Sequence, residues 1–126
     1  MRVRVLGAAA GGGFPQWNAD SEACRRARRG DPTARPATQA SITLSADGER
    51  WILVNASPDL RQQIEANRCL HPSGGRRSSP IAAVVLTNAD VDAVAGLLHL
   101  REGTPFAIYG HPRVLRALDD LSLIHI

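Results

Sequence analysis

The sequence predicts a mixed α/β fold, because short apolar runs alternate with helical patterns along the chain and turn residues separate them. Its 126 residues, 44% of them apolar, can supply the core of one domain. Five runs have the length and the apolar pattern of β-strands. They are residues 2–6, 39–45, 50–54, 81–86 and 106–109.

The second and third of these strands are expected to form a hairpin. Ala46, Asp47 and Gly48 give a turn signal between them. The fourth strand is apolar without interruption, which is typical of a strand buried on both faces. Residues 71–80 before it are rich in Gly, Ser, Pro and Arg, so we expect a loop there.

Three helices are expected between and after the strands. The first begins at Ser57, Pro58 and Asp59 and runs to about Asn67. The serine can cap free amide groups, the proline fits the first helical position, and the acid suits the positive end of the helix dipole. The second helix is expected at residues 91–101, ending at Gly103, and residues 112–118 are expected to begin the third.

The charge of the chain does not indicate a nucleic-acid or membrane protein. All 15 basic residues are arginine, and the net charge is +3. The one dense cluster, from Arg25 to Arg29, lacks interleaved aromatic side chains and is interpreted as the solvated face of a helix. No apolar run approaches the roughly 18 residues of a membrane span, and the run after Arg4 is too short for a secretory signal. We therefore expect a cytoplasmic protein with no nucleic-acid partner.

Polar side chains gather where the fourth strand meets the following helix. Asn88, Asp90 and Asp92 stand there, and their oxygens suit hard or loosely held metal ions. Two other roles are open, since Asp90 and Asp92 can cap a helix or interact with its dipole, and Asn88 can stabilise a turn. His99 would lie about 10 Å further along the helix than Asp92, too far to share a metal ion with it.

A second candidate region follows the first strand. The glycine run Gly11–Gly13 matches neither nucleotide-binding pattern, so we interpret it as a loop that needs unusual backbone angles near a site. Gln16, Trp17 and Asn18 come next and are candidate substrate-binding residues, with Trp17 as an aromatic wall.

The loop around Asn88 resembles the metal-binding loop of the metallo-β-lactamase superfamily, whose pattern is His-x-His-x-Asp-His. Asn88 and Asp90 stand at the first two histidine positions, Asp92 at the aspartate, and Ala93 at the last histidine. The resemblance therefore keeps the spacing but replaces the imidazole ligands. A histidine restored at position 93 is expected to raise iron occupancy if the reaction needs that ligand.

Longer segments resemble the pyrroloquinoline quinone (PQQ) biosynthesis protein B family. They are GAAAGGGFPQWN at residues 7–18, TQASI at 38–42, NASPD at 55–59, RQQI at 61–64, GLL at 96–98 and LREG at 100–103. The resemblance implies a four-layer αββα sandwich of the metallo-β-lactamase type, of which residues 1–120 would be the N-terminal half. The last six residues, 121–126, resemble a translated transposon end from sequencing libraries, and we expect them to be a non-native tail.

The family resemblance also implies a function. It implies a role in PQQ biosynthesis, as a hydroxylase that uses non-haem Fe(2+) and acts on the tyrosine of a Glu-Tyr precursor, with Asp92 as the strongest iron ligand. The partner would be a small-molecule or dipeptide precursor of PQQ, and this chain alone is expected to be inactive. The alternative is a carrier that helps to move PQQ or its precursor toward the periplasm. Hydrolysis of the lactamase type fits least, because the leading histidines are replaced.

A structural zinc site is not expected. Ala19 and Ser21 stand where family members carry cysteines, and only Cys24 is kept. A tetrahedral zinc ion needs about four ligands, so one thiolate cannot hold it. We expect Cys24 to be an ordinary half-buried thiol.

Overall fold

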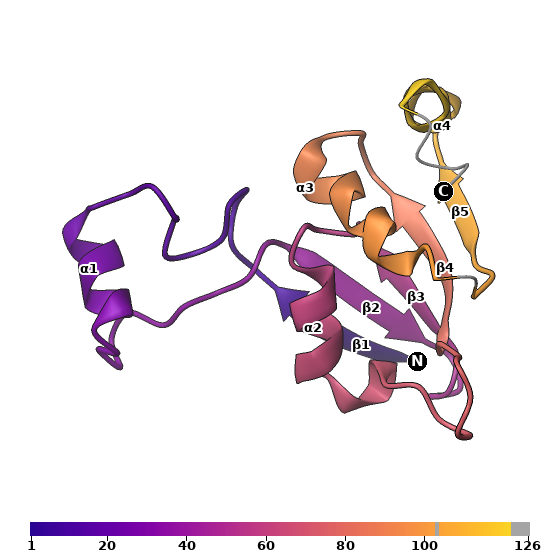
Figure 1. Cartoon of the computed structure of the whole chain (residues 1–126), viewed down its shortest axis with the longest axis horizontal. Helices are drawn as coiled ribbons and strands as arrows, with labels where there is room; N and C mark the ends of the chain where they lie inside the picture. The colour runs from indigo at the N-terminus through magenta and orange to yellow at the C-terminus, as the bar shows by residue number, and fades with distance from the viewer. Residues whose placement is uncertain (103, 122–126) are drawn as a thin grey trace.

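The chain forms one five-stranded sheet in a computed structural model that describes residues 1–102 and 104–121 (Figure 1). The strands lie side by side in chain order, and they are β1 (Arg2–Gly7), β2 (Ser41–Ser45), β3 (Trp51–Val54), β4 (Ile81–Leu86) and β5 (Ala107–Gly110). The pairs β1–β2 and β2–β3 are antiparallel, whereas β3–β4 and β4–β5 are parallel. The carboxyl ends of β3 and β4 therefore meet at one edge, where the Asn88 loop begins.

The predicted hairpin between β2 and β3 is confirmed. Asp47 Oδ1 accepts hydrogen bonds from the backbone amides of Glu49 (2.8 Å) and Arg50 (2.9 Å), and these bonds close the turn. The second strand begins at Ser41 and not at residue 39. Gln39 lies before the strand because it forms an isolated bridge with Ala9 instead.

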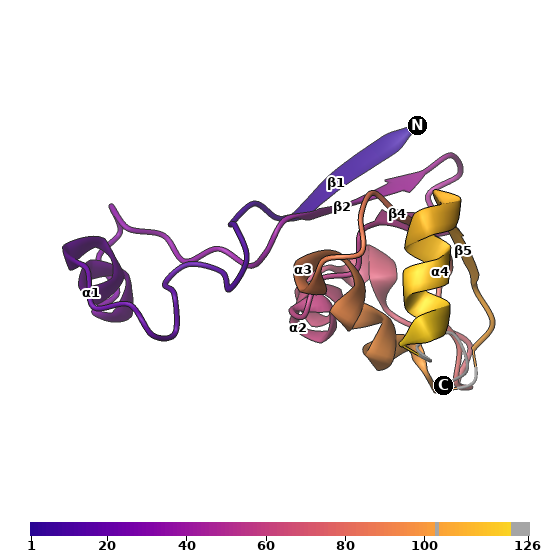
Figure 2. The same ribbon diagram turned by 90° about the horizontal axis from the view of Figure 1, so that it is seen from above.

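Helices cover one face of the sheet (Figure 2). They are α2 (Leu60–Ala66), α3 (Val91–Val94), the 3-10 segment η2 (Ala95–Leu100) and α4 (Pro112–Asp120), with a further 3-10 turn η1 (Arg68–Leu70) after α2. Leu53, Leu60, Val84 and Leu118 are fully buried between these helices and the sheet. No helix among residues 1–102 and 104–121 is long and apolar enough to cross a membrane.

Two helix boundaries differ from the prediction. α2 begins at Leu60, three residues after Ser57, although the Ser57 hydroxyl does accept from the Asp59 amide (3.2 Å). The helix predicted at residues 91–101 is wrong beyond Val94, where the chain continues as η2. The reason is a backbone contact with the segment after β3: Ala56 N donates to Ala93 O (2.7 Å), and Gly96 N donates to Ala56 O (2.9 Å). Ala93 O and Gly96 N therefore bond to Ala56 and are not used in the i to i−4 hydrogen bonds that would continue an α-helix. Gly103 and residues 122–126 lie outside the described residues.

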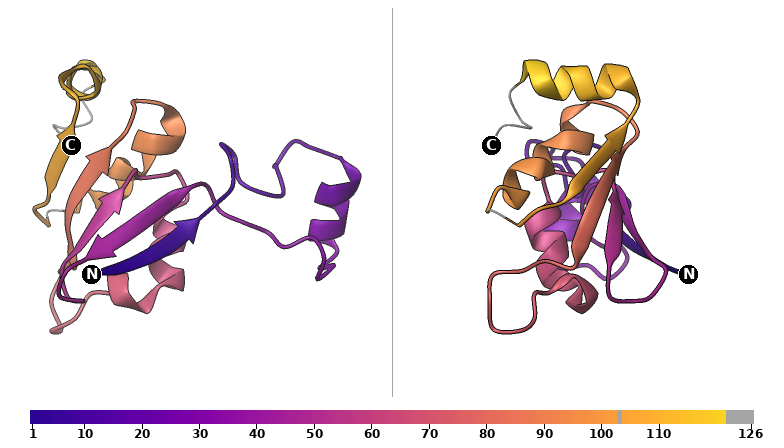
Figure 3. Two further views of the ribbon diagram at one scale, coloured as in Figure 1. Left: turned by 180° about the vertical axis from the view of Figure 1, so that it is seen from behind. Right: turned by 90° about the vertical axis from the view of Figure 1, so that its right-hand side faces the viewer.

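No described helix or strand covers the other face of the sheet (Figure 3). Four large side chains on this face are exposed: Val3, Val5, Ile52 and Tyr109, which range from 39% to 63%. Their cross-strand partners on the same face are Leu44, Ile42, Ala83 and Val85.

A lobe formed by residues 14–37 stands away from the sheet (Figures 1 and 2). It carries the helix α1 (Glu22–Arg28), which the strand and helix pattern missed, although the arginine cluster was interpreted as a helix face. Phe14 and Ala37 pair across the base of the lobe in an antiparallel bridge. Its two connections to the sheet thus run side by side, next to the glycine run.

Candidate functional site

The Asn88 loop leaves the end of β4 in a side-chain-stabilised turn. Asn88 Oδ1 accepts from the backbone amide of Asp90 (2.8 Å), and Asn88 Nδ2 donates to Thr87 Oγ1 (3.1 Å). This is the turn-forming role of asparagine that the sequence left open. The amide oxygen of Asn88 already has a partner, so it is a weaker metal-ligand candidate than the carboxylates.

The two aspartates of this loop are both exposed, and neither caps α3 through its side chain. Asp90 is the N-cap residue of α3 but makes no side-chain capping bond, and Asp92 lies in the first turn. A methyl group added at Gly11 would lie 3.4 Å from Asp92 Oδ2. The first residue of the glycine run is therefore packed against the Asp92 carboxylate, and the two candidate regions of the sequence meet at this point.

Position 93 belongs to the apolar core and not to the loop surface. Ala93 is 2% exposed and lies within the cluster of buried side chains that includes Leu97 and Ala56. Its carbonyl holds the Ala56 amide at 2.7 Å. An imidazole at position 93 would have to displace these neighbours, so the expectation that a histidine there completes a metal site is not supported by this packing.

The glycine run adopts the unusual backbone angles that the sequence predicted. Gly12 and Gly13 have φ values of +92° and +79°, which side-chain-bearing residues rarely adopt. The Gln16 side chain lies directly against Gly12, so a side chain at that position would collide with it. The run is thus shaped by close approach on two sides, Asp92 at its start and Gln16 at its middle.

Of the three candidate substrate-binding residues, Gln16 lies against the glycine run, whereas the other two side chains are exposed. Trp17 is 81% exposed, and Asn18 is also exposed. Arg28 of α1 donates to the backbone oxygens of Gln16 (2.6 Å) and Ala19 (2.7 Å), which fixes this segment against the lobe. Trp17 therefore projects from an ordered backbone and does not wall a closed site within the described residues.

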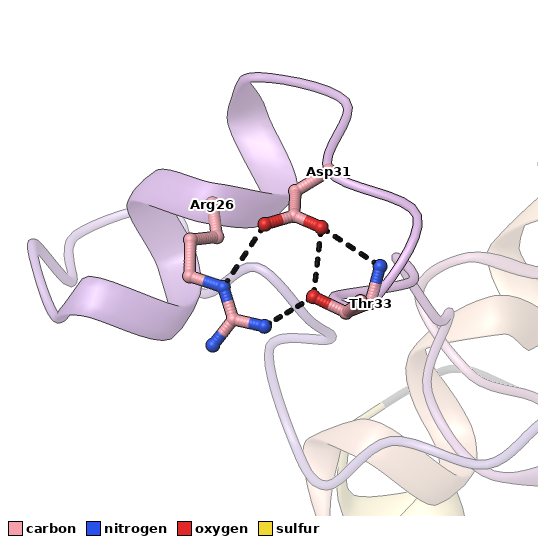
Figure 4. A network of polar contacts seen from close by, with 3 residues as sticks. All are labelled: Arg26, Asp31 and Thr33. Atoms are coloured by element: carbon pink, nitrogen blue, oxygen red, sulfur yellow. Dashed lines mark hydrogen bonds and ion pairs between the residues drawn. The ribbon is translucent and has the colours of Figure 1, made fainter.

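A second arginine of α1 holds the end of the lobe together (Figure 4). Arg26 Nε donates to Asp31 Oδ2 (3.1 Å), and its terminal nitrogen donates to Thr33 Oγ1. The Thr33 amide and hydroxyl both donate to Asp31 Oδ1 (2.9 and 2.7 Å). Hydrogen bonds from Thr33, followed by the one from Arg26, lower the pKa of Asp31 to about 2. This network joins α1 to the turn that follows it in the lobe.

The described residues do not fit a complete transition-metal site. Among residues 1–102 and 104–121, no three His, Cys, Asp or Glu side chains come together in a way that could hold a metal ion. Asp92 and Asp90 share a loop, but Asn88 is engaged in its turn and Ala93 is in the core. His99 is exposed and lies against Pro58 O (3.4 Å), away from a shared ligand set. Cys24 is buried in the lobe, more fully than the sequence predicted.

Sequence reasoning missed two residues near the site. Asn55, directly after β3, has a φ of +65°, and its side chain reaches Thr87, directly after the neighbouring strand β4. A non-glycine residue with positive φ is uncommon, and this conformation of Asn55 is visible only in the structure. The second is Asp59, which was interpreted from the sequence as a partner of the helix dipole. Its carboxylate accepts hydrogen bonds from Gln39, which lies outside the helix.

A family model described as the beta-lactamase superfamily domain matches residues 50–124. The chain is 59% identical over 120 residues to coenzyme PQQ synthesis protein B of Methylorubrum extorquens. That match covers 95% of this chain and 40% of the relative, so the chain spans about 40% of the length of the relative.

Two solved structures share the fold. The crystal structure of Zn(2+)-bound PqqB from Methylobacterium extorquens is similar over 98% of this chain and 41% of its own, with a TM-score of 0.94 and 58% identity. A diphosphatase from the PhnP family covers 98% of this chain and 46% of its own, with a TM-score of 0.74 and 24% identity. The second likeness concerns the fold alone.

Proposed function

Since this chain belongs to the beta-lactamase superfamily, and its curated relatives are coenzyme PQQ synthesis proteins B, we propose that it serves in the biosynthesis of pyrroloquinoline quinone. The observation that carries the proposal is the close match to PqqB, at a TM-score of 0.94 and 58% identity over 98% of the chain. The match includes the Asn88 loop and the glycine run, whose contact at Asp92 and Gly11 brings the candidate residues together. We place this role in the cytoplasm.

The finer proposal is hydroxylation of the tyrosine ring in a Glu-Tyr precursor by a non-haem iron protein. Iron would supply oxygen activation. The described residues supply only Asp92 and Asp90 as carboxylates on one exposed loop, which is fewer than the two histidines and one carboxylate of the usual iron site. The contribution that we assign to this chain is therefore one side of the site: an acidic loop, and the glycine run packed against it.

A carrier of PQQ or of its precursor is the second candidate. One observation favours it: Ala93 stands where the superfamily pattern has its last histidine, and a carrier needs no reactive metal. The two candidates differ in a measurable way. Stoichiometric iron together with oxygen uptake supports the hydroxylase, whereas tight binding of the quinone without a metal supports the carrier.

The proposed role can be tested by a chimera. This chain replaces the corresponding segment of the Methylorubrum extorquens protein, and the chimera is expressed in a strain that lacks its own protein B. Production of PQQ is expected. Loss of PQQ in the Asp92→Ala chimera, with the Glu22→Ala chimera as a control on an exposed carboxylate of the lobe, is expected as well. A soluble chimera that yields no PQQ would contradict the proposal.

A further inference from the structure

A cavity of about 320 Å³ lies at the base of the lobe, beside the second and third glycines of the run whose first glycine lies against Asp92. Its walls include the backbone of the glycine run, the apolar side chains of the lobe base and two polar side chains at the start of α2. The residues concerned are Gly12, Gly13, Phe14, Pro36, Asp59 and Gln62. The volume suits a small organic group.

The Asp59 carboxylate in this wall is held by neutral donors. Its Oδ2 accepts from the backbone amide of Gln39 (2.9 Å) and from the Gln39 side-chain amide (3.1 Å). Gln39 is only 6% exposed, so both donors are fixed. Asp59 is also the N-cap residue of α2, yet it makes no capping bond with its side chain. The Asp59 carboxylate therefore does not cap α2, and it forms part of the cavity wall.

The negative charge of Asp59 is not balanced within the described part of the chain, where the contacts of its side chain are with uncharged groups. A half-buried carboxylate in this state favours a cationic ligand. A metal ion is a poor fit, because it needs several ligating side chains and no such group exists among the described residues. An ammonium group is a good fit, because it can donate both to a carboxylate and to the amide oxygen of a residue such as Gln62.

We propose that this cavity binds the primary ammonium group of an amino acid or short peptide, with Asp59 as the counter-charge. The apolar walls from Phe14 and Pro36 suit the carbon frame next to the amine. The inference rests on the proposed function, which it deepens by naming the end of the peptide precursor that is held. The glycine run has Asp92 beside its first residue and the cavity beside its second and third, so the two sites adjoin along one loop.

The test measures binding of two probes to the purified chimera, in which this chain replaces the corresponding segment of the Methylorubrum extorquens protein, by saturation-transfer NMR at low micromolar protein concentration. The probes are the dipeptide glutamyl-tyrosine and its N-acetyl derivative, which lacks the charge on nitrogen. Acetylation is expected to weaken binding by about tenfold or more. Asp59→Asn, which keeps an oxygen acceptor for Gln39, is expected to weaken binding of the free dipeptide to the same extent and to leave the acetylated one unchanged.

Glu65→Gln is the matched control, because it removes an exposed negative charge from the same helix outside the cavity. Equal binding of the two dipeptides, no binding of either, or an equal loss in Glu65→Gln and Asp59→Asn would overturn the inference. If the Asp59→Asn chimera does not fold, the comparison of the two probes on the unaltered chimera decides the matter. If the chimera makes PQQ but binds the free and the acetylated dipeptide equally well, the inference about the cavity is refuted and the proposed function is not. If the free amine is bound preferentially but no PQQ is made, the proposed function is refuted and the inference about the cavity is not.

Discussion

Asn55 at the end of β3 and Thr87 at the end of β4 are joined by mutual hydrogen bonds of their side chains. The Thr87 amide donates to Asn55 Oδ1 (3.0 Å), Asn55 Nδ2 donates to Thr87 Oγ1 (2.9 Å), and the Thr87 hydroxyl lies 3.2 Å from Asn55 Oδ1. Asparagine suits this position because it offers both a donor and an acceptor and because it tolerates a positive φ. The pair fixes the point from which the Asn88 loop departs.

Asn55→Ala is expected to lower the free energy of unfolding by about 1–3 kcal/mol, because Thr87 loses its hydrogen bonds to Asn55 and alanine tolerates the positive φ less well. Asn55→Asp keeps the acceptor for the Thr87 amide. Its free energy of unfolding is therefore expected to lie between those of Asn55→Ala and the unaltered chain. Denaturant unfolding followed by circular dichroism measures the change. Asn18→Ala is a control on the exposed lobe and is expected to have little effect. Equal stability of Asn55→Ala and the unaltered chain would show that the pair does not stabilise the strand ends.

Ala93→His is expected to destabilise the chain by about 1–3 kcal/mol, since it forces a larger side chain into a packed core. It is not expected to increase metal binding. Thermal unfolding checks the expected loss of stability, and the metal content after dialysis checks whether metal binding increases. A variant with unchanged stability and several-fold higher iron occupancy would restore the expectation drawn from the sequence, that a histidine here completes the ligand set.

The chain alone is expected to bind zinc or ferrous ions weakly, because two carboxylates on one loop lack the ligand number of a tight site. Isothermal titration calorimetry with each ion measures the affinity. Submicromolar zinc affinity that Asp92→Ala removes, and that Glu65→Ala leaves intact, would contradict this expectation.

The uncovered sheet face is expected to make the isolated chain bind hydrophobic dyes and self-associate. Full burial of a Val, Ile or Leu side chain contributes roughly 1.5–3 kcal/mol, and each exposed side chain on this face lacks part of that contribution, against about 5–15 kcal/mol of net stability for a typical domain. Val5→Thr with Ile52→Thr is expected to reduce dye fluorescence and the apparent mass in sedimentation. Val91→Thr is the matched control, because Val91 is 72% exposed but lies on α3. A monodisperse monomer that binds no dye and unfolds in one sharp transition would refute this prediction.

The hydrogen-bond network around Asp31 is expected to hold α1 to the turn after it at neutral pH, and to weaken only in strong acid. Because the pKa of Asp31 lies at about 2, below its ordinary value of 3.8, its contribution is complete above that ordinary value and is lost as the pH falls toward about 2. An NMR titration of the Asp31 carboxyl carbon measures the midpoint, and a midpoint near 3.8 would disprove the network. Asp31→Asn is expected to speed tryptic cleavage after the α1 arginines at neutral pH, whereas Asp20→Asn, whose ion pair is exposed and long (3.9 Å), is not.

The mixed α/β class, the five strands and the family resemblance could be predicted from the sequence, and they are confirmed. Strands are predictable because each has a local apolar pattern between turn residues. The end of helix α3 was not, because it depends on backbone bonds from Ala56, which is remote in sequence. β2 shows the same limit: Ser41, Thr43 and Ser45 face the helices, with their hydroxyls bonded to backbone oxygens near or in β3, while Ile42 and Leu44 face the uncovered side. A rule that buries only apolar residues would assign these two faces in reverse.

The candidate site could be predicted in part. The spacing of Asn88, Asp90 and Asp92 located the loop, and the glycine run was correctly interpreted as a loop with unusual angles. The contact between the loop and the glycine run could not be predicted, since it depends on how the lobe base pairs with the chain before β2. The metal role of the loop residues and the substrate role of Gln16, Trp17 and Asn18 stay predictions.

The segment from Thr87 to Ala93 is tethered at both ends to consecutive residues of one other segment, Asn55 at its start and Ala56 at its end. Such a double anchor removes most of the conformational freedom of the loop before any ligand arrives. The ordering entropy that a flexible loop would lose on binding is therefore already lost in folding. A ligand at Asp90 or Asp92 should meet a pre-organised surface, with an affinity set by contacts and desolvation and hardly at all by loop closure.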